Sequence, residues 1–390
     1  MKKQRVDRRN FIKGMATSAA MLSAVPPSAF ALTNGGSVTY DSVQQTEEPP
    51  KGPYRLKFAV VGTNHPHIYG MVAAALRGGG ELAFLYETEP ELIAAFKKQY
   101  PDVKMARSEN EILEDPSIKL VLSSIIPDER APLGIRVMKH GKDYMVDKPG
   151  ITTLDQLAEA RKVQAETKRI YSIDYSERFE NKATIRAAEL ARAGAIGKVV
   201  QTIGMGPHRM SLNARPPWFF DKKRYGGIIC DIGSHQADQF LYFTNSEKAE
   251  VVASQIGNVH HPQYPNFEDF GDLMLRGDGG AGYIRVDWFT PDGLSSWGDG
   301  RLTILGTDGF MEVRKNVDIA GKGNGSHLFL VDQKETRYID TTNQPLLYGQ
   351  RLIDDVLNRT ETAMSQAHCF LAMELVLKAQ AQAQRVSFKA

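Results

Sequence analysis

Residues 59–67 read AVVGTNHPH, and this stretch decides how the first half of the chain is interpreted. The apolar run before Gly62 predicts a strand, and the run HIYGMVAAALRGGG that follows predicts a helix. A strand, a tight glycine turn and a helix are typical of the start of a doubly wound parallel sheet. The turn usually carries three glycines spaced G-x-G-x-x-G, but here Asn64 and His67 stand at the second and third positions.

Two interpretations of this loop stay open: it does not bind a nucleotide, or the nucleotide site is built in another way. Gly62 supplies the tight turn, and Asn64 is the non-glycine residue that most readily adopts a positive φ. Pro66 suits the first turn of a helix. His67 cannot allow the close packing of helix on strand that glycine allows, so His65 and His67 are expected to contact a pyrophosphate or a substrate instead.

The segments after the loop alternate between short apolar runs and amphipathic runs as far as residue 175. Strands are expected at 55–62, 81–87, 118–126, 143–150 and 169–175, and helices at 67–80, 89–101, 129–142 and 153–168. Beyond 176, a helix at 181–194 leads into longer strand-type runs with Gly-rich turns, and a helix at 360–383 closes the chain. The sequence therefore predicts an α/β protein: a Rossmann doubly wound parallel sheet (54–175), then an α+β domain with a large, mostly antiparallel sheet (176–390).

A carboxylate favours the nucleotide interpretation. Glu87 follows the second expected strand, 25 residues after Gly62, close to the spacing of the acid that binds an adenosine ribose. The alternative is a solvated acid that caps the next helix. No Lys or Arg follows in ETEPE, so a plain ribose is expected rather than a 2′-phosphate, which favours NAD over NADP.

The first 31 residues read as a targeting segment. A basic start with DRRNFIK at 7–13, an apolar stretch and Ala29-Phe30-Ala31 resemble a twin-arginine export signal. A plain secretory signal or an uncleaved anchor is the alternative, although the apolar stretch is short and broken by prolines, so no stable membrane anchor is expected. The protein is expected to meet the twin-arginine export machinery and to reach the periplasm, with 32–53 as a polar linker.

Charge and metal-ligand patterns exclude two classes of function. Residues 1–31 contain six Lys and Arg residues and one Asp, so their removal changes the formal net charge from +2 to −3, and no nucleic-acid surface is expected. The pairs His65/His67 and His260/His261 lack carboxylate or cysteine partners at ligand spacing, so no metal is expected. Of the 2 cysteines, Cys230 is expected to be a buried free thiol; a disulfide with Cys369 stays open.

Two further motifs carry chemistry. Asp147-Lys148-Pro149 ends the strand at 143–150, and GGIICDIGSHQAD at 226–238 places Asp231 and His235 four residues apart, on one face of a helix. When a secondary alcohol loses a hydride, a histidine or a lysine can accept the hydroxyl proton, and an ammonium can stabilise the charge that forms on oxygen. Taken singly, the same residues could be a surface lysine, a helix cap and a core histidine.

Together with GAIGKV at 194–199, these motifs resemble the family of glucose–fructose oxidoreductase, inositol dehydrogenase and the rhizopine catabolism protein (Gfo/Idh/MocA). The resemblance covers nearly everything from Tyr54 onward. It implies that Lys148 acts beside a nicotinamide, and that Asp231 and His235 bind and deprotonate a substrate hydroxyl. Asp147 stands where Glu is commoner in the family, and Pro127-Asp128 stands where Pro-Asn is usual.

The resemblance also implies an NAD(P)-dependent oxidoreductase of a sugar, glycoside or polyol, and a homo-oligomer (dimer or tetramer) formed by the second domain. Because no free NAD pool exists outside the inner membrane, the export expected from the N-terminal segment implies a tightly held cofactor. Alternatives are an NAD-dependent redox-neutral glycoside hydrolase and a non-catalytic sugar or nucleotide binder. The expected cofactor-binding residues are Gly62, Thr63, Asn64, His65, His67, Glu87, Ser124, Asp147 and Lys148. Aromatic rings stack on sugars and basic side chains donate to hydroxyls, so substrate contacts are expected from Tyr175, Arg178, His208, Arg209 and Trp218.

Overall fold

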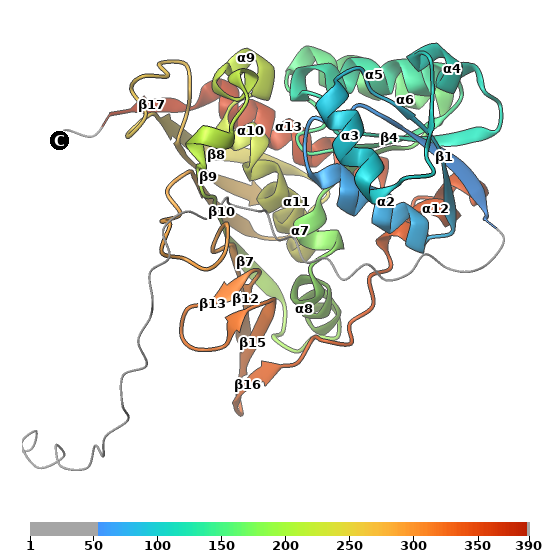
Figure 1. Ribbon diagram of the computed structural model, residues 1–390. Helices are drawn as coiled ribbons and strands as arrows, with labels where there is room; N and C mark the ends of the chain where they lie inside the picture. The colour runs from blue at the N-terminus through green and yellow to red at the C-terminus, as the bar shows by residue number, and fades with distance from the viewer. Residues whose placement is uncertain (1–53, 388–390) are drawn as a thin grey trace, which may run out of the picture. The chain divides into compact units, whose positions relative to one another are not determined.

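A six-stranded parallel sheet forms the first part of the computed structural model, which describes residues 54–387 (Figure 1). The predicted export signal and linker therefore lie outside the described residues. The strands run in the order β3-β2-β1-β4-β5-β6, and every pair is parallel. Their bounds are β1 (Leu56–Val61), β2 (Gly80–Tyr86), β3 (Lys104–Met105), β4 (Ile118–Ser123), β5 (Asp143–Asp147) and β6 (Tyr171–Asp174). This order confirms the predicted doubly wound sheet.

Helices connect these strands, and four of them occur where the alternating pattern predicts: α2 (His67–Arg77), α3 (Pro90–Gln99), α5 (Pro127–Lys139) and α6 (Leu154–Thr167). The short helix α4 (Glu109–Glu114) and the two-residue strand β3 were not predicted. Helix α2 buries Ile68, Met71 and Val72, which recur at helical spacing and pack toward β2, β4 and β5. All residues of β5 are buried, as expected of a strand covered on both faces.

The second sheet has nine strands in the order β16-β15-β12-β11-β7-β10-β9-β8-β17. Only the pairs β7–β10 and β8–β17 are parallel, so the sheet is mixed and mostly antiparallel, which confirms the prediction. The bounds are β7 (Val199–Pro207), β8 (Ala249–Gly257), β9 (Phe270–Gly277), β10 (Ala281–Asp287), β11 (Arg301–Gly306), β12 (Gly309–Arg314), β15 (His327–Asp332), β16 (Thr336–Ile339) and β17 (Gln384–Val386), beside a small β13 (Val317–Asp318)–β14 (Gly323–Asn324) pair.

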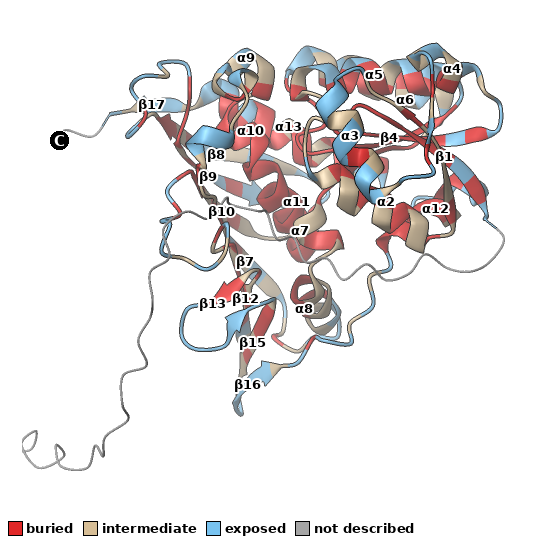
Figure 2. Ribbon diagram, in the orientation of Figure 1, coloured by how far each residue is buried: buried red, intermediate tan, exposed pale blue. Residues whose placement is uncertain are grey.

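Helices cover one face of this sheet. Helix α11 (Gly233–Thr244) packs on β7 and β10, α8 (Lys182–Arg192) on β12 and β15, and α13 (Gln366–Gln382) on β8. Close approach of α11 requires small residues beneath it: a Cβ on Gly204 would lie 2.7 Å from Gln236, and one on Gly282 would lie 2.7 Å from Phe240. Because α13 also packs on β6, it joins the two sheets, and Figure 2 shows α11 almost wholly buried.

Three features of the chain after residue 225 differ from the prediction. The closing helix begins at Gln366 rather than at 360, because the Asp355 carboxylate accepts hydrogen bonds from Thr360, Thr362 and Ala363 and holds them in a loop. Helix α12 (Tyr348–Asn358) was not predicted. Asp231 ends a short helix, α10 (Ile228–Asp231), and His235 belongs to α11, so the predicted single helix is interrupted at Ile232.

Two other expectations concern the thiols and the membrane. Cys230 and Cys369 are both buried and free, which confirms the buried free thiol expected at position 230. Among residues 54–387, we find no helix with the length and apolar character needed to cross a bilayer.

Candidate active site

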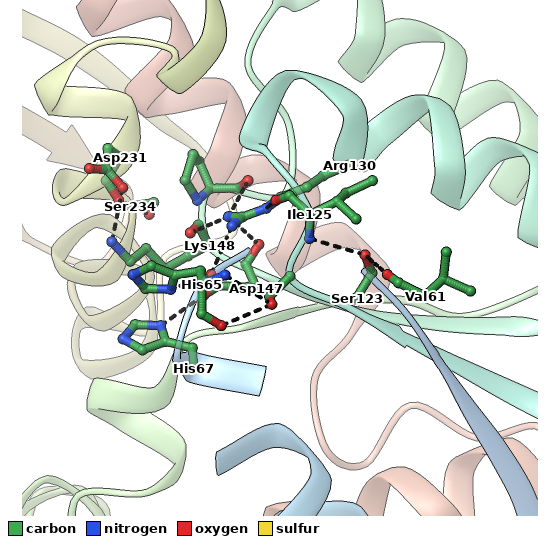
Figure 3. Close-up of polar contacts among 12 residues, drawn as sticks. Val61, His65, His67, Ser123, Ile125, Arg130, Asp147, Lys148, Asp231 and Ser234 are labelled. Atoms are coloured by element: carbon green, nitrogen blue, oxygen red, sulfur yellow. Dashed lines mark hydrogen bonds and ion pairs between the residues drawn. The ribbon is translucent and has the colours of Figure 1, made fainter. Parts of the chain in front are cut away.

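A buried ion pair lies at the centre of the site. Lys148 directly follows β5, and its Nζ donates to Oδ1 of Asp231 across 2.9 Å, although the two residues are 83 positions apart (Figure 3). Lys148 is 5% exposed and Asp231 9% exposed. Burial opposes ionisation of Asp231, but the Lys148 ammonium outweighs it and lowers the pKa of this carboxyl. The pair therefore places a cation and an anion at the edge of the parallel sheet where ligands bind.

His235 adds a neutral base to this pair. Its side chain is buried, and its Nδ1 has no hydrogen-bond partner within the protein. The pKa of His235 is lowered to about 4, chiefly because of burial; the Lys148 charge contributes to the lowering and Glu177 opposes it. An unprotonated imidazole with a free nitrogen can accept a proton.

The backbone of Gly62 confirms the tight turn that was expected at this glycine. Gly62 has φ +75°, and a Cβ there would lie 1.7 Å from Cγ2 of Ile125. Ser124 holds the other side of the loop, because its amide donates to the Gly62 carbonyl and its Oγ donates to the His65 carbonyl. Asn64 differs from the prediction: within 54–387, positive φ outside glycine occurs only at Lys168, Ser211, Asn245 and Arg359, so Asn64 does not imitate the second glycine.

The two loop histidines converge on Asp147. Nδ1 of His67 hydrogen-bonds Oδ1 of Asp147 at 2.8 Å, and Nδ1 of His65 lies 2.8 Å from Oδ2. Figure 3 shows Asp147 between these rings and Arg130, whose Nη2 donates to Oδ2 across 2.9 Å. The ring of His67 therefore points toward the end of β5, next to Lys148. The aspartate side chain is shorter than the glutamate that is commoner in the family, and the two loop histidines extend to it.

Asp147 sets the tautomer of its partners. Although burial opposes ionisation, Arg130 and the two histidines hold the pKa of Asp147 well below its ordinary value, so it is a carboxylate that only accepts. Nδ1 of His67 must then carry the hydrogen, and Nε2 is the free acceptor on the far side of the ring. Burial lowers the pKa of His65 to about 4, which keeps this second ring neutral.

Arg130 is a site residue that the sequence analysis missed. It is 1% exposed, and its guanidinium donates to the Ile125 carbonyl at 2.6 Å and to the Lys148 carbonyl at 2.5 Å, besides Asp147. It therefore fixes the turn at the cis Lys148–Pro149 bond from a neighbouring helix. In the sequence, an arginine among polar residues of a predicted helix gave no signal of this role.

The loop histidines have a carboxylate partner, contrary to what the sequence spacing indicated. Nitrogen atoms of His65 and His67 and an oxygen of Asp147 all lie within 4.8 Å of one another, so a carboxylate partner exists, although it comes from 80 residues away. These three side chains could hold a cation. The same carboxylate already binds the Arg130 guanidinium, and this positive charge opposes a metal ion at the same place.

A second buried acid lies beside His235. Glu177, on the short helix α7 (Ser176–Phe179), accepts hydrogen bonds from Gln236 at 2.9 Å and Gln239 at 3.3 Å, and forms an ion pair with Lys315. Burial opposes ionisation of Glu177, but Lys315 and the neighbouring His235 lower its pKa to about 2. Sequence reasoning did not find this pair, because 138 residues separate its members.

One of the five predicted substrate residues lies near the ion pair. His208 is half-buried; burial lowers its pKa to about 3, with further influence from the charges of Lys148, Glu177 and Asp231. Its ring packs 4.5 Å from Trp297, between centroids. His208 therefore lies close enough to Lys148, Glu177 and Asp231 for their charges to act on it, and its contact with a substrate stays a prediction.

The structure gives three of the other predicted substrate residues different partners. Nε and Nη2 of Arg178 each donate to a carboxylate oxygen of Asp238 across 2.7 Å in the interior. Nη2 of Arg209 donates to backbone carbonyls of the 291–296 loop. Tyr175 is fully buried, with its hydroxyl directed to the Cys369 carbonyl and its ring 6.4 Å from that of His235. Trp218 is half-buried beside Phe219. Arg178 and Arg209 thus have partners within the protein, and the substrate contacts expected of them stay predictions.

The loop and strand ends fit a dinucleotide. Helix α2 has no acidic residue in its first turn, so no side chain of that turn repels a phosphate. Glu87 lies at the end of β2, as predicted, and its carboxylate accepts hydrogen bonds from the Thr63 amide and hydroxyl at 2.9 and 3.0 Å. Thr63 thus ties the acid to the glycine turn, next to the crevice where the strand order reverses between β1 and β4.

Comparisons with known proteins agree with this fold. Residues 56–175 match the profile of the oxidoreductase family with an NAD-binding Rossmann fold, and residues 184–312 match that of the GFO/IDH/MocA C-terminal domain. The NAD⁺-dependent scyllo-inositol 2-dehydrogenase of Bacillus subtilis is 26% identical over 245 residues, 60% of this chain and 67% of that protein. The 1,5-anhydro-D-fructose reductase of Ensifer adhaerens is 28% identical over 189 residues, 47% of this chain and 55% of that protein.

A solved structure extends the likeness to the whole fold. A crystal structure from Erwinia carotovora atroseptica SCRI1043, classed among the oxidoreductases, is 45% identical, with a TM-score of 0.83. The match covers 85% of this chain and 100% of that one. The chain therefore belongs to the Gfo/Idh/MocA family of NAD-binding oxidoreductases.

Proposed function

We propose that the protein oxidises a secondary hydroxyl of a sugar or polyol, or reduces the corresponding ketone, with NAD as its cofactor. The observation that carries this proposal is the buried Lys148–Asp231 pair beside the unpartnered Nδ1 of His235, at the carboxyl edge of an NAD-type sheet. The named relatives are a polyol dehydrogenase and a sugar reductase, which supports an oxidoreductase over the hydrolase and binding-protein alternatives.

Each residue of the site has a distinct role in this proposal. NAD, when bound, supplies the hydride acceptor. His235, neutral at pH 7, accepts the hydroxyl proton, and the Lys148 ammonium stabilises the charge that forms on the substrate oxygen. Asp231 orients Lys148 and offers its second oxygen to a neighbouring hydroxyl, and His208 lines the same site. Asp147 and Arg130 hold the turn that carries Lys148.

A panel assay tests the proposed reaction. Purified protein would be mixed with NAD⁺ and scyllo-inositol, myo-inositol or levoglucosan, and with NADH and 1,5-anhydro-D-fructose, and the absorbance at 340 nm followed. Growth or loss of this absorbance with at least one substrate is expected, together with its disappearance in Lys148→Met. Absence of any change with a broad set of sugars and polyols would contradict the proposal.

Export is the second part of the proposed function. The motif DRRNFIK and the apolar stretch after it support transport of the folded protein by the twin-arginine machinery, with its cofactor already bound and tightly held. In cells that express the full chain, Arg8→Lys/Arg9→Lys is expected to abolish the periplasmic fraction. Denaturation of the exported protein is expected to release NAD, identified by its mass; protein without nucleotide would contradict tight binding.

Self-association is the third part. The face of the nine-stranded sheet opposite the helices carries exposed apolar side chains, Ile203, Met274, Leu305 and Phe310, which are 36–50% exposed and lie on neighbouring strands. Such a patch supports a homo-oligomer formed through this face. Light scattering of Met274→Lys/Phe310→Lys tests it: a monomer is expected in place of a larger wild-type species.

A further inference from the structure

Two ammonium groups lie near His235, and each has a carboxylate of its own. The charges of Lys148 and Lys315 both disfavour a proton on His235. Lys148 binds Asp231 at 2.9 Å, and Lys315 binds Glu177. The side chains of Lys315 and Glu177 are 2% and 10% exposed. Neither ammonium is therefore left uncompensated for an anionic group of a ligand.

The Glu177 side chain belongs to the same edge of the parallel sheet as Lys148. Strand β6 lies beside β5, and Asp174 stands opposite Asp147 in the register of the two strands. Lys148 directly follows Asp147, and helix α7, which carries Glu177, begins two residues after Asp174. Glu177 therefore lies at the carboxyl edge, where parallel sheets of this kind bind ligands.

Helix α11 brings Glu177 next to His235. Nε2 of Gln236 donates to Oε2 of Glu177 across 2.9 Å. Nε2 of Gln239 donates to the same oxygen at 3.3 Å and to the His235 carbonyl at 3.0 Å. Lys315 also donates to Oε2, and in the described part of the chain no hydrogen bond to Oε1 of Glu177 occurs. One carboxylate oxygen thus joins the surrounding elements, and the other is available to a ligand.

Several buried acceptor atoms around His235 also lack partners. Oε1 of Gln236, Oε1 of Gln239 and Nδ1 of His235 are buried without a hydrogen bond to the described part of the protein. Buried polar atoms are normally hydrogen-bonded, so these atoms indicate a place where a ligand supplies donors. Hydroxyl groups donate to such acceptors, whereas an ionised carboxylate only accepts.

We propose that Glu177 is a specificity-determining residue: its Oε1 accepts a substrate hydroxyl other than the reacting one, and its pair with Lys315 restricts the site to neutral polyhydroxylated substrates. This inference rests on the proposed function and names the class of substrate within it. A sugar acid or a sugar phosphate would bring a negative charge to a carboxylate, with no free ammonium to compensate it. Although burial opposes ionisation of Glu177, Lys315 and His235 lower its pKa to about 2, so the carboxylate is charged at neutral pH.

Glu177→Gln tests both parts of this inference. The variant loses the charge of the acceptor and leaves the Lys315 ammonium without its counterion. With the panel substrate that the wild type oxidises fastest, we expect KM to rise by about tenfold, because a hydrogen bond to a charged acceptor is lost. The value of kcat is expected to change by less than about threefold, because the groups at the reacting oxygen are unchanged.

Four competitive inhibitors measure the preference for neutral ligands: D-glucose and myo-inositol, with D-glucuronate and myo-inositol 1-phosphate as their anionic counterparts. Where one of them is oxidised, its KM is compared instead. In the wild type, each anion is expected to bind at least about tenfold more weakly than its neutral counterpart. In Glu177→Gln, the anions are expected to bind about tenfold more tightly than in the wild type, because Lys315 is no longer neutralised.

The double variant Glu177→Gln/Lys315→Met separates the two roles and keeps the test valid where the single variant does not fold. Replacement of the whole pair leaves no uncompensated buried charge, so the double variant is expected to fold. It should show the raised KM for the neutral substrate without the gain in anion binding. Glu159→Gln/Lys162→Met, an exposed pair of the same residue types on α6, is the matched control and should behave as the wild type.

Several outcomes would overturn this inference. An unchanged KM in the folded variants would show that Glu177 only joins the surrounding elements. A wild type that binds the anionic probes as tightly as the neutral ones, or that binds neither neutral probe, would overturn the substrate class. Anion binding that does not improve in a folded Glu177→Gln would show that Lys315 does not face the ligand. A wild type that oxidises no panel substrate overturns the proposed function itself, whereas an active wild type with unaffected variants overturns only this inference.

Discussion

The Lys148 ammonium meets the Asp231 carboxylate at 2.9 Å, and this contact ties the end of β5 to the helices that cover the second sheet. Removal of one partner from a buried pair leaves an uncompensated charge, which commonly costs about 3–5 kcal/mol. Stability and activity should therefore respond differently when the pair is broken and when it is replaced as a whole.

Lys148→Met is expected to lower the free energy of unfolding and to reduce kcat by about 100-fold or more, because the variant loses both the ion pair and the cation beside the reacting oxygen. The double variant Lys148→Met/Asp231→Asn is expected to recover stability but not activity. Urea unfolding and the 340 nm assay measure the two effects, and Lys162→Met is an exposed control. A double variant as unstable as the single one would contradict the buried-pair account.

Buried neutral histidine predicts a pH dependence of stability. The pKa of His235 is about 4 in the folded protein, against about 6.5 in an unfolded chain, so between these values the unfolded state binds more protons. Stability contributed by this group is present above pH 6.5 and is lost as the pH falls toward 4. Asp174, whose pKa burial raises, acts in the opposite direction, so wild type must be compared with a variant.

His235→Asn should accordingly lose less stability than the wild type between pH 7 and pH 5, by about 1–2 kcal/mol. Urea unfolding at the two pH values gives the difference directly. Equal losses in both proteins would mean that His235 is protonated in the folded state at pH 5, against its burial.

Alanine substitutions at Gly62 and Gly194 separate the cost of a positive φ from the cost of steric overlap of the Cβ. Gly62→Ala would suffer both a positive φ and a Cβ 1.7 Å from Ile125, whereas Gly194, at φ +79°, has no atom within 4 Å of its would-be Cβ. Gly194→Ala is therefore expected to cost about 1–2 kcal/mol, and Gly62→Ala clearly more, together with weaker NAD binding. Thermal unfolding and calorimetric titration with NAD⁺ measure these effects; equal costs would contradict a tight loop.

The sequence predicted those strands, turns and helices whose residue pattern lies within one short stretch of the chain. The apolar run to Val61, the glycine turn and the helix from His67 occur as the residue pattern indicates, and Glu87 lies at the end of β2 as its spacing predicts. Helix α12 was missed although Tyr348, Leu352 and Val356 recur at helical spacing, so its signal was present. The residue types in 360–364 resemble those of a helix, and their pattern does not reveal that the Asp355 side chain, five to eight residues earlier, accepts hydrogen bonds from Thr360, Thr362 and Ala363.

The contacts of the site that the sequence did not reveal join residues that are far apart in the chain. No local pattern connects His67 with Asp147, Arg130 with the Lys148 carbonyl, or Glu177 with Lys315. Arg178 was expected to contact a ligand because of its place at the junction of the two predicted domains, and nothing in the sequence indicated that Asp238 would bind it in the interior. Residue types at strand ends indicated where chemistry would occur, and the sheet topology determined which of them meet.

We expect the Glu87 carboxylate to make the protein prefer NAD to NADP. It already accepts hydrogen bonds from the Thr63, Thr88 and Glu89 amides, so it is a fixed negative charge at the end of β2. A 2′-phosphate near it would be repelled, whereas ribose hydroxyls can donate to it.

Glu87→Gln removes this charge and one acceptor oxygen. We expect the KM for NAD⁺ to rise by about tenfold, with kcat little changed, and the KM for NADP⁺ to fall, because repulsion is lost. Measurement of kcat/KM with both cofactors gives the ratio, and Glu89→Gln, an exposed neighbour that bonds Asn64, is the control. If the ratio of kcat/KM values for the two cofactors is the same in wild type and Glu87→Gln, then Glu87 caps the loop without contacting the ribose, and the preference for NAD has another source.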